Sequence, residues 1–368
     1  MPGLGCRRLA PERGKNAPFS LARALLLPSL LRVDTLRWGL CWVALLLVGG
    51  CASAERPSTC GKSSEPVLLA TGEVVALGIA LDATHAYWTV GRYIADGIPS
   101  GGKVMRVAFS GGAPETLASD LRLPTDIAVD AHNVYWIDDF SNEVLSVPSS
   151  GGDPISVART HEVSALTIDA TSAYWLDVDG AKRTSTVKKA PLAGGAAIEL
   201  ASAQLYTGGL AVDSTSVYWI DLDQPLGTVR VMKVPLEGGP ATTLLSMASY
   251  SPNEAGTLAV DETSAYFVGG ADGVLKIPLA GGTPTLLTSG SSGALVPSVA
   301  IDATNVYWAD LAPEGGSVRV MKVPRNGGTE TSVATNLPVS TRIVAHGSKI
   351  CWITNDATSA VWCIDSCN

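Results

Sequence analysis

The sequence predicts an all-β chain that folds as a single seven-bladed β-propeller of four-stranded blades. A stretch typified by Val299–Pro324 returns along the chain with small changes. Its aspartate recurs every 39 to 48 residues, at Asp82, Asp130, Asp169, Asp213, Asp261 and Asp302, and His346 takes the seventh place. Each repeat holds four short apolar runs and no 3.6-residue apolar period, which excludes helical repeats and is typical of propeller blades.

Each repeat predicts its four strands in order. In the sixth copy the run Val299–Ile301 leads into Asp302, whose side chain can hydrogen-bond its own backbone in a tight turn. The next run, Val306–Trp308, is β-branched and aromatic, a composition that suits buried strands. After a loop of variable length, the third run, Val318–Val323, ends at a proline and a Gly-Gly pair. A fourth run then leads to the following repeat.

Both ends of the propeller are expected to contribute to the last blade. The seventh repeat offers only three runs, near Ile343, Ile350 and Val361. Before the first repeat lies the run Pro66–Thr71, which resembles the fourth run of the fifth repeat, Pro284–Ser289. Because an unpaired strand edge favours aggregation, we expect this N-terminal run to close the ring as the outer strand of the seventh blade.

The first fifty residues differ from the rest and predict export. They hold seven Lys or Arg against two Asp or Glu, so the remaining chain carries a net charge of −13. Their apolar segment Trp38–Gly50 is thirteen residues long, too short to span a bilayer and right for the core of a signal peptide. We therefore expect a leader and lipoprotein signal peptide over residues 1–50, a polar tether over 51–65 and the propeller over 66–368.

The apolar segment ends in Leu-Val-Gly-Gly-Cys51, which resembles a bacterial lipobox, where small residues precede a cysteine that receives lipid. This resemblance implies that Cys51 is lipidated, and Ala52 after it favours the outer membrane. The expected location is thus the cell envelope, with the lipid as the only membrane contact. A plain signal peptide with an incidental cysteine is the alternative. The charge of −13 argues against nucleic acid or an acidic membrane surface as partner.

Four cysteines remain beyond Cys51, an even number that predicts disulfides in an exported protein. Cys351 and Cys363 lie on neighbouring runs of the last repeat, and Cys60 and Cys367 flank the closing strand and the run that it would pair with. The expected bonds are Cys351–Cys363 and Cys60–Cys367. Free or metal-binding thiols are the alternative, against which stands the lack of a clustered metal spacing.

The letters Tyr-Trp-Ile-Asp at Tyr135 and Tyr218, Tyr-Trp-Leu-Asp at Tyr174 and Tyr-Trp-Ala-Asp at Tyr307 resemble the YWTD repeats of low-density lipoprotein receptor propellers. The similarity covers most of residues 66–368 and implies the fold, with a face that typically binds other proteins. It does not imply receptor function. The first copy departs from the motif with Val90, the fifth reads Tyr-Phe267-Val, and there are seven repeats where that family has six.

Chemical roles compete with this structural interpretation. The aspartates after Tyr-Trp could form an acidic ring, and calcium could be bound with Asp179 or Asp223; the ring residues are Asp138, Asp177, Asp221 and Asp310. The alternative is that they satisfy turn amides at strand ends, and we expect neither a metal nor a cofactor. The histidines lack spaced partners and the inner runs lack a recurrent acid, amide or histidine, so no catalytic residue is expected.

Binding is expected on one face. In a propeller the loops between second and third strands share a face with those between blades, and here these loops are long and irregular, which is where function usually lies. The candidate residues are Tyr93, Tyr206, Tyr250, Asp179 and Asp223. Each tyrosine could equally pack its own loop. We expect a monomeric, lipid-anchored, non-catalytic binding or scaffold module for a protein or cell-envelope ligand. The alternative is a propeller hydrolase or lactonase-like enzyme with a metal at the central channel.

Overall fold

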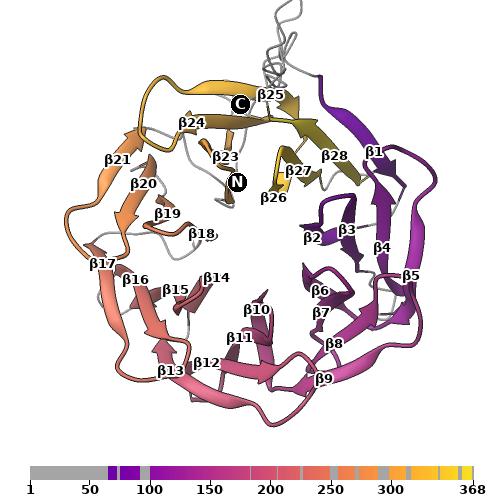
Figure 1. Cartoon of the computed structure of the whole chain (residues 1–368), viewed down its shortest axis with the longest axis horizontal. Helices are drawn as coiled ribbons and strands as arrows, with labels where there is room; N and C mark the ends of the chain where they lie inside the picture. The colour runs from indigo at the N-terminus through magenta and orange to yellow at the C-terminus, as the bar shows by residue number, and fades with distance from the viewer. Residues whose placement is uncertain are drawn as a thin grey trace, which may run out of the picture. The chain divides into compact units, whose positions relative to one another are not determined.

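The computed structural model describes residues 65–72, 75–91, 100–182, 184–204, 206–223, 227–248, 256–269, 273–288, 298–311, 316–338, 340–354 and 359–366. These residues form seven four-stranded antiparallel sheets, which stand as blades around a common axis (Figure 1). No helix among them is long and apolar enough to cross a membrane. The predicted all-β propeller of seven four-stranded blades is confirmed.

Six blades are built from consecutive strands, with the first strand of each innermost. Blade 1 is β2 (Ala76–Leu81), β3 (His85–Val90), β4 (Gly102–Ala108) and β5 (Glu115–Leu121). Blade 2 is β6 (Pro124–Val129), β7 (Asn133–Asp138), β8 (Glu143–Pro148) and β9 (Ile155–Arg159). Blade 3 is β10 (Glu162–Ile168), β11 (Ser172–Asp179), β12 (Thr184–Pro191) and β13 (Ile198–Gln204).

The next three blades follow the same order. Blade 4 is β14 (Tyr206–Val212), β15 (Ser216–Asp223), β16 (Thr228–Pro235) and β17 (Thr242–Ala248). Blade 5 is β18 (Leu258–Val260), β19 (Ser264–Gly269), β20 (Gly273–Pro278) and β21 (Thr285–Thr288). Blade 6 is β22 (Val299–Ile301), β23 (Asn305–Leu311), β24 (Val318–Pro324) and β25 (Thr331–Leu337).

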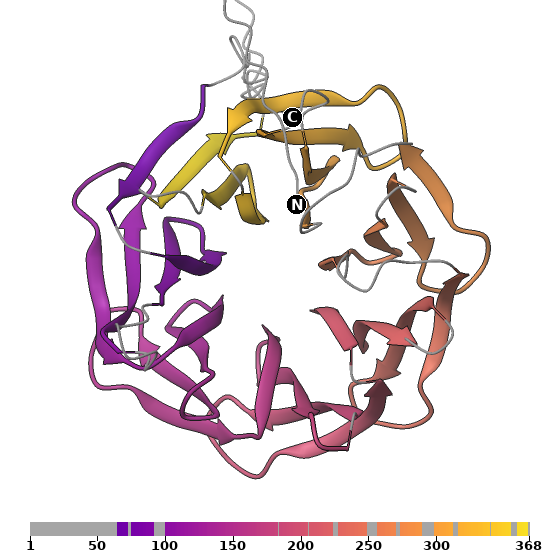
Figure 2. The same cartoon turned by 180° about the vertical axis from the view of Figure 1, so that it is seen from behind.

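Blade 7 joins strands from both ends of the described chain. Its order from the outside inward is β1 (Val67–Thr71), β28 (Ala360–Asp365), β27 (Lys349–Thr354) and β26 (Ser340–His346). In Figures 1 and 2 the indigo β1 runs along the yellow β28, and the register pairs Val67 with Cys363 and Leu68 with Trp362. The predicted closing strand is therefore confirmed, and it protects the edge of β28 from other chains.

The hydrophobic core lies between blades. The described residues form seven buried clusters, each with members from two neighbouring blades. The tryptophan of the second strand is central to most of them; Trp136, for example, is fully buried against Val104 and Leu117 of blade 1. In blade 5 Phe267 takes this place and is equally buried, which explains why the motif tolerates that departure. Both faces of a blade are covered, so its second strand is buried at nearly every position rather than at alternate ones, as the patterns of β3 and β7 show.

The recurrent aspartate organises the turn between the first and second strands, as predicted. In the first six repeats one carboxylate oxygen accepts the N–H groups two and three residues on, at 2.6–2.8 Å. The other oxygen accepts the hydroxyl of the tyrosine five residues on, at 2.6–2.9 Å, in the pairs Asp82–Tyr87, Asp130–Tyr135, Asp169–Tyr174, Asp213–Tyr218, Asp261–Tyr266 and Asp302–Tyr307. We call this arrangement the Asp–Tyr clamp. It ties each inner hairpin to the middle of its blade.

The clamps change the acidity of both partners. Burial, reinforced by the hydrogen bond to aspartate, raises the pKa of Tyr135 and of Tyr218 to about 12. Burial alone would raise the pKa of the Asp213 carboxyl, but the Tyr218 hydroxyl and two backbone N–H groups lower it by more. The Asp213–Tyr218 clamp is thus a neutral phenol donating to a charged carboxylate over the physiological pH range.

Candidate functional site

The connections between blades and the loop between the second and third strands meet at one end of blade 2. In blade 2 the N–H of Asp139, after the second strand, donates to the carbonyl of Leu123 in the connection between blades, at 3.0 Å. The N–H of Thr160, in the next connection, donates to the carbonyl of Asn142 at 2.9 Å. We call this end of the propeller, which carries the connections between blades and the loops between second and third strands, the loop face. Its two classes of loop support one another through backbone hydrogen bonds.

The four aspartates that follow the Tyr-Trp pairs are buried at this end and already have partners. Asp138 accepts the backbone N–H groups of Arg122, Phe140 and Ser141 at 3.0–3.2 Å. Asp177 accepts the N–H of His161 and the ammonium of Lys188. The remaining two pair with arginines of the third strand, as Asp221–Arg230 and Asp310–Arg319.

These partners bear on the acidic-ring alternative. Burial opposes ionisation of Asp177, but the hydrogen bond and charge of Lys188 and the hydrogen bonds from His161 together outweigh it and lower the pKa of this carboxyl. No group of three or more His, Cys, Asp or Glu side chains within the described ranges could hold a metal ion. The aspartates act as strand-end residues that bind loop amides and third-strand cations, which is the structural role weighed from the sequence.

The predicted binding residues are described only in part. Asp179 ends β11 and is partly exposed; it accepts the backbone N–H of Lys182 at 3.0 Å and its ammonium at 2.7 Å. These hydrogen bonds lower the pKa of the Asp179 carboxyl. Tyr206 begins β14, where its backbone pairs with Leu222, and Asp223 ends β15. Tyr93 and Tyr250 lie outside the described residues, as do Cys51, Cys60 and Cys367.

An ion pair on the innermost strands was missed by sequence reasoning. Arg342 of β26 holds Asp126 of β6 through two bonds, Nη1–Oδ1 at 2.6 Å and Nη2–Oδ2 at 3.2 Å. The pair joins blades 7 and 2 past blade 1, and the Asp126 side chain is only 9% exposed. Asp126 also accepts the backbone N–H of Leu166 in blade 3 at 2.9 Å. Through these bonds the pair connects blades 7, 2 and 3.

Arg342 and Asp126 occupy the same position of their repeats, four residues before the turn residue. Thr257 and Ser298 occupy it in blades 5 and 6 and accept an N–H from the next blade, at 2.6 and 2.9 Å. In blade 1 the position is Gly78, where a Cβ would lie 2.5 Å from the carbonyl oxygen of Thr125. An alignment of the repeats at this position would have shown that Asp126 and Arg342 carry opposite charges. A search for one residue type that recurs in every blade could not have shown this.

Beside this pair, the blade 2 portion of the loop face carries a carboxylate and an aromatic side chain. Phe140 is 49% exposed, and the guanidinium carbon of Arg122 lies 4.6 Å from the centre of its ring. Burial, and then the nearby charges of Asp138, Asp126 and Glu162, raise the pKa of Asp139 to about 6, although the Thr125 hydroxyl opposes the shift. An exposed aromatic ring beside partly desolvated polar groups is a frequent composition for protein contacts.

Replacing Asp139 with asparagine should stabilise the fold at neutral pH. The folded carboxyl, with a pKa of about 6, binds its proton more tightly than an unfolded carboxyl with a pKa of about 4. The stabilisation that comes from this tighter proton binding in the folded state is therefore fully present below pH ~4 and is lost as pH rises through about 6. Denaturant unfolding from pH 4 to 8 should show Asp139→Asn equal to wild type at pH 4 and more stable at pH 8. A variant less stable at pH 8 would contradict this account.

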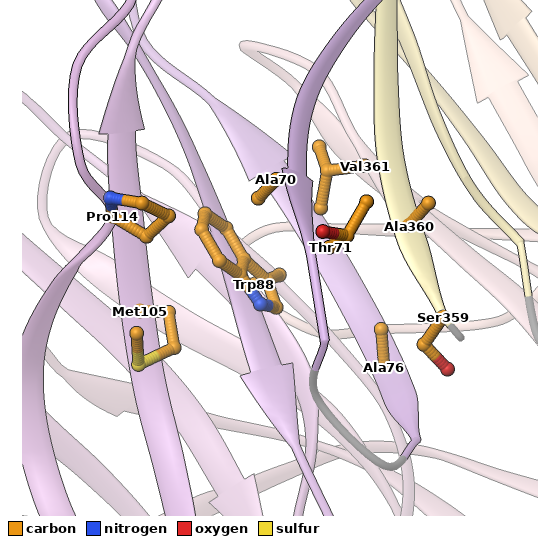
Figure 3. Close-up of a pocket in the computed structure, with 9 residues that line it drawn as sticks. All are labelled: Ala70, Thr71, Ala76, Trp88, Met105, Pro114, Ser359, Ala360 and Val361. Carbon is orange, nitrogen blue, oxygen red and sulfur yellow. The ribbon is translucent and has the colours of Figure 1, made fainter. Parts of the chain in front are cut away.

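Among the described residues, two cavities border blade 7. One, of about 30 Å³, lies at the ring closure between blades 7 and 1 and has room for about one water molecule (Figure 3). The other is an open groove of about 540 Å³ along β25, walled on the far side by Trp362 and by Glu65 and Pro66. The first is too small for a substrate. The second begins where the preceding chain enters the propeller, at Glu65.

No protein-family model matches the sequence, and no curated protein matches it either. Solved structures do. A puromycin-hydrolysing peptidase from Mycobacterium tuberculosis has a TM-score of 0.59 at 14% identity, over 80% of this chain and 52% of the other. A Bacteroides fragilis protein proposed to be a 6-phosphogluconolactonase has a TM-score of 0.51 at 15% identity, over 74% and 88%. A structure of a nidogen/laminin complex has a TM-score of 0.44 at 19% identity, over 56% and 76%.

The chain thus spans about half the length of the peptidase that it resembles. At 14% and 15% identity these likenesses concern the fold, and propellers of one architecture carry unrelated activities. The chain is similar to other β-propellers in fold.

Proposed function

We propose that this protein is a lipid-anchored β-propeller of the cell envelope that binds a protein or a cell-envelope ligand through its loop face, without catalysis. The observation that carries the proposal is the contrast between the two ends of the blades. One end is held by the regular Asp–Tyr clamps and short Gly-Gly turns. The other end carries irregular loops and the exposed Phe140 stacked on Arg122.

The rigidity of the frame supports a binding role. Inter-blade cores, clamps and the Arg342–Asp126 pair fix the strand ends from which the loops leave, so this frame is ordered before binding. Pre-organised surfaces lose less entropy on association. The fold also fits an enzyme, but Asp126, the buried carboxylate of the inner strands, is neutralised by Arg342 and accepts two backbone N–H groups. A channel metal would have to displace that arginine.

The anchoring part of the proposal rests on the lipobox-like Leu-Val-Gly-Gly-Cys51, and the tether on residues 51–65. A Cys60–Cys367 bond belongs to the same proposal. The register of β1 on β28 places Glu65 toward the end of β28 that carries Asp365. In the sequence, Cys60 precedes Glu65 by five residues and Cys367 follows Asp365 by two, which supports the proposed bond.

Removing the irregular loops should abolish partner binding while the fold survives. The loops Gly91–Gly102, Asp177–Thr186 and Asp221–Thr228 would be cut to the length of the blade 5 turn, Val268–Gly273. Long loops contribute little to stability, so unfolding should stay cooperative. Crosslinking in intact cells, followed by identification of the attached molecules, should find partners on wild type and none on the shortened variant.

A matched pair of point variants locates the contact. Phe140→Ala removes a 49% exposed side chain from the loop face, and Ile198→Ala removes a 52% exposed one from the outer strand β13. We expect crosslinking to fall with the first variant and to persist with the second. Retention of every partner by the shortened variant, or metal-dependent hydrolysis of a lactone panel by the purified protein, would refute the proposed function.

A further inference from the structure

Blade 7 lacks the clamp that the other six blades share. The turn aspartate is replaced by His346, which is exposed, and the tyrosine five residues on is replaced by Cys351, which is fully buried. Both halves of the hydrogen-bonded pair are thus missing together. The backbone turn persists, since the N–H of Ser366 donates to the carbonyl of Ser348 as the equivalent groups do in other blades.

A third residue is exchanged with them. In blades 3, 4 and 5 the tyrosine of the clamp faces a cation on the third strand, in the pairs Tyr174–Lys189, Tyr218–Lys233 and Tyr266–Lys276. In these three blades the ammonium lies 5.6–5.8 Å from the ring centre. Each ammonium also donates to a backbone carbonyl oxygen of the next blade, at 3.1–3.5 Å. The acceptors are the carbonyls of Leu236, Leu279 and Arg325. In blade 7 the facing pair is Cys351 and Cys363.

These two cysteines form a disulfide, with their Cα atoms 4.1 Å apart. It joins the second and third strands of blade 7 where blades 3, 4 and 5 use a clamp and an inter-blade cation. The predicted Cys351–Cys363 bond is therefore present in the structure. One covalent bond replaces several polar contacts at the corresponding positions.

The disulfide lies at the ring closure. Cys363 is the register partner of Val67 in β1, so it belongs to the strand that receives the N-terminal strand. Both cysteines share a buried cluster with Ala70 of β1 and Ala76 and Trp88 of blade 1. Figure 3 shows Ala70 of β1 between Trp88 of blade 1 and Val361 of β28, around the small cavity at this junction.

We propose that the Cys351–Cys363 disulfide is a redox latch on the closure of the ring. In the oxidised protein it holds β28 on β27 and so preserves the edge on which β1 pairs. A dithiol reductant breaks it by two-electron exchange: one thiolate attacks a sulfur of the bond, and the second resolves the mixed disulfide. The reductant leaves as a disulfide, and Cys351 and Cys363 become thiols.

Reduction leaves blade 7 without covalent bond, clamp or facing cation at these positions. The sulfur atoms are buried, since Cys351 is 0% and Cys363 4% exposed, so attack follows local opening of the same blade. Opening and reduction therefore reinforce each other, and release of β1 is their shared result.

Hydrogen exchange with and without dithiothreitol tests the latch. The full chain is used with Cys60→Ser and Cys367→Ser in every sample, so that the internal bond of blade 7 is the one reduced. We expect amides of β1 and β28 to exchange at least about tenfold faster after reduction, while β11 and β12, in a blade with an intact clamp, change less than about twofold. Equal acceleration in all blades, or none in β1 and β28, would overturn the proposal.

A variant with a restored clamp provides the control. His346→Asp, Cys351→Tyr and Cys363→Lys together give blade 7 the residues of blades 3 and 4. Exchange in its β1 and β28 should be slow and indifferent to dithiothreitol. Should it fail to fold, Cys351→Ala with Cys363→Ala should exchange like the reduced protein in either condition. If the double alanine variant exchanges as slowly as the oxidised protein, the disulfide is not the latch.

Discussion

Replacing Arg342 with leucine should lower the free energy of unfolding by about 3 to 5 kcal/mol, the usual cost of leaving one partner of a buried ion pair alone. The residue left behind is Asp126, whose side chain is only 9% exposed and would lose its ion-pair partner. Two backbone N–H groups, of Ile127 and Leu166, would remain as its donors. Denaturant unfolding at neutral pH measures the loss.

A double-mutant cycle identifies the cause. Asp126→Asn keeps an oxygen for the N–H of Leu166 but removes the charge, so it should recover most of the stability lost in Arg342→Leu. Arg159→Leu is the comparison, because Arg159 is 86% exposed and pairs with Glu143 at 3.1 Å. An exposed pair of this kind contributes about 0 to 1 kcal/mol. Additive losses in the Arg342 and Asp126 variants would show that the two side chains do not stabilise the ring as a pair.

The fold could be predicted from the sequence because the residues that specify each blade lie close together within one repeat. Each of the first six copies contains its own turn aspartate, aromatic second strand and Gly-Gly turn, and the seventh keeps the aromatic second strand, so seven copies specify seven sheets. The closing strand also followed, since the run Pro66–Thr71 was a fourth strand without a blade. The two residues of each Asp–Tyr clamp are also only five positions apart in the sequence. The sequence predicts the turn, but it does not show that the tyrosine hydroxyl reaches the aspartate carboxylate.

The ion pair on the innermost strands could not be predicted from the repeats in the same way. Arg342 and Asp126 are 216 residues apart and meet only because the ring closes. Within its own strand each looks like an exception to the apolar run. Only the register of the repeats, combined with the circular order of the blades, brings them together. Phe140 was likewise overlooked, because one aromatic residue in a short loop resembles many others until its exposure is known.

The candidate binding residues illustrate what a sequence leaves open. Asp179 was expected to be available for a ligand, and it is partly exposed but already bound to Lys182. The role of a loop side chain depends on such neighbours, which differ between blades because the loops have no common pattern. A repeat specifies the frame, and each loop must be determined by its own contacts.

Replacing Cys51 with serine should move the protein from the membrane fraction to the soluble fraction of the cell envelope. The prediction rests on the thirteen-residue apolar segment that ends in Val-Gly-Gly-Cys51 and on the polar tether after it. A single acyl chain binds a membrane weakly and reversibly, whereas two or more chains on one cysteine give stable anchoring, so the loss should be nearly complete. Detergent phase partitioning and acyl labelling measure it.

Cys41→Ser is the matched control, because Cys41 lies in the same apolar segment ten residues upstream. Its replacement should leave partitioning and labelling unchanged. Both variants should retain the unfolding transition of wild type, since the propeller begins after the tether. Unchanged mature size, partitioning and labelling in Cys51→Ser would show that the segment is an ordinary signal peptide. The loop-face proposal would then have to be tested on a protein that diffuses freely, where binding depends on affinity alone and not on confinement to a membrane surface.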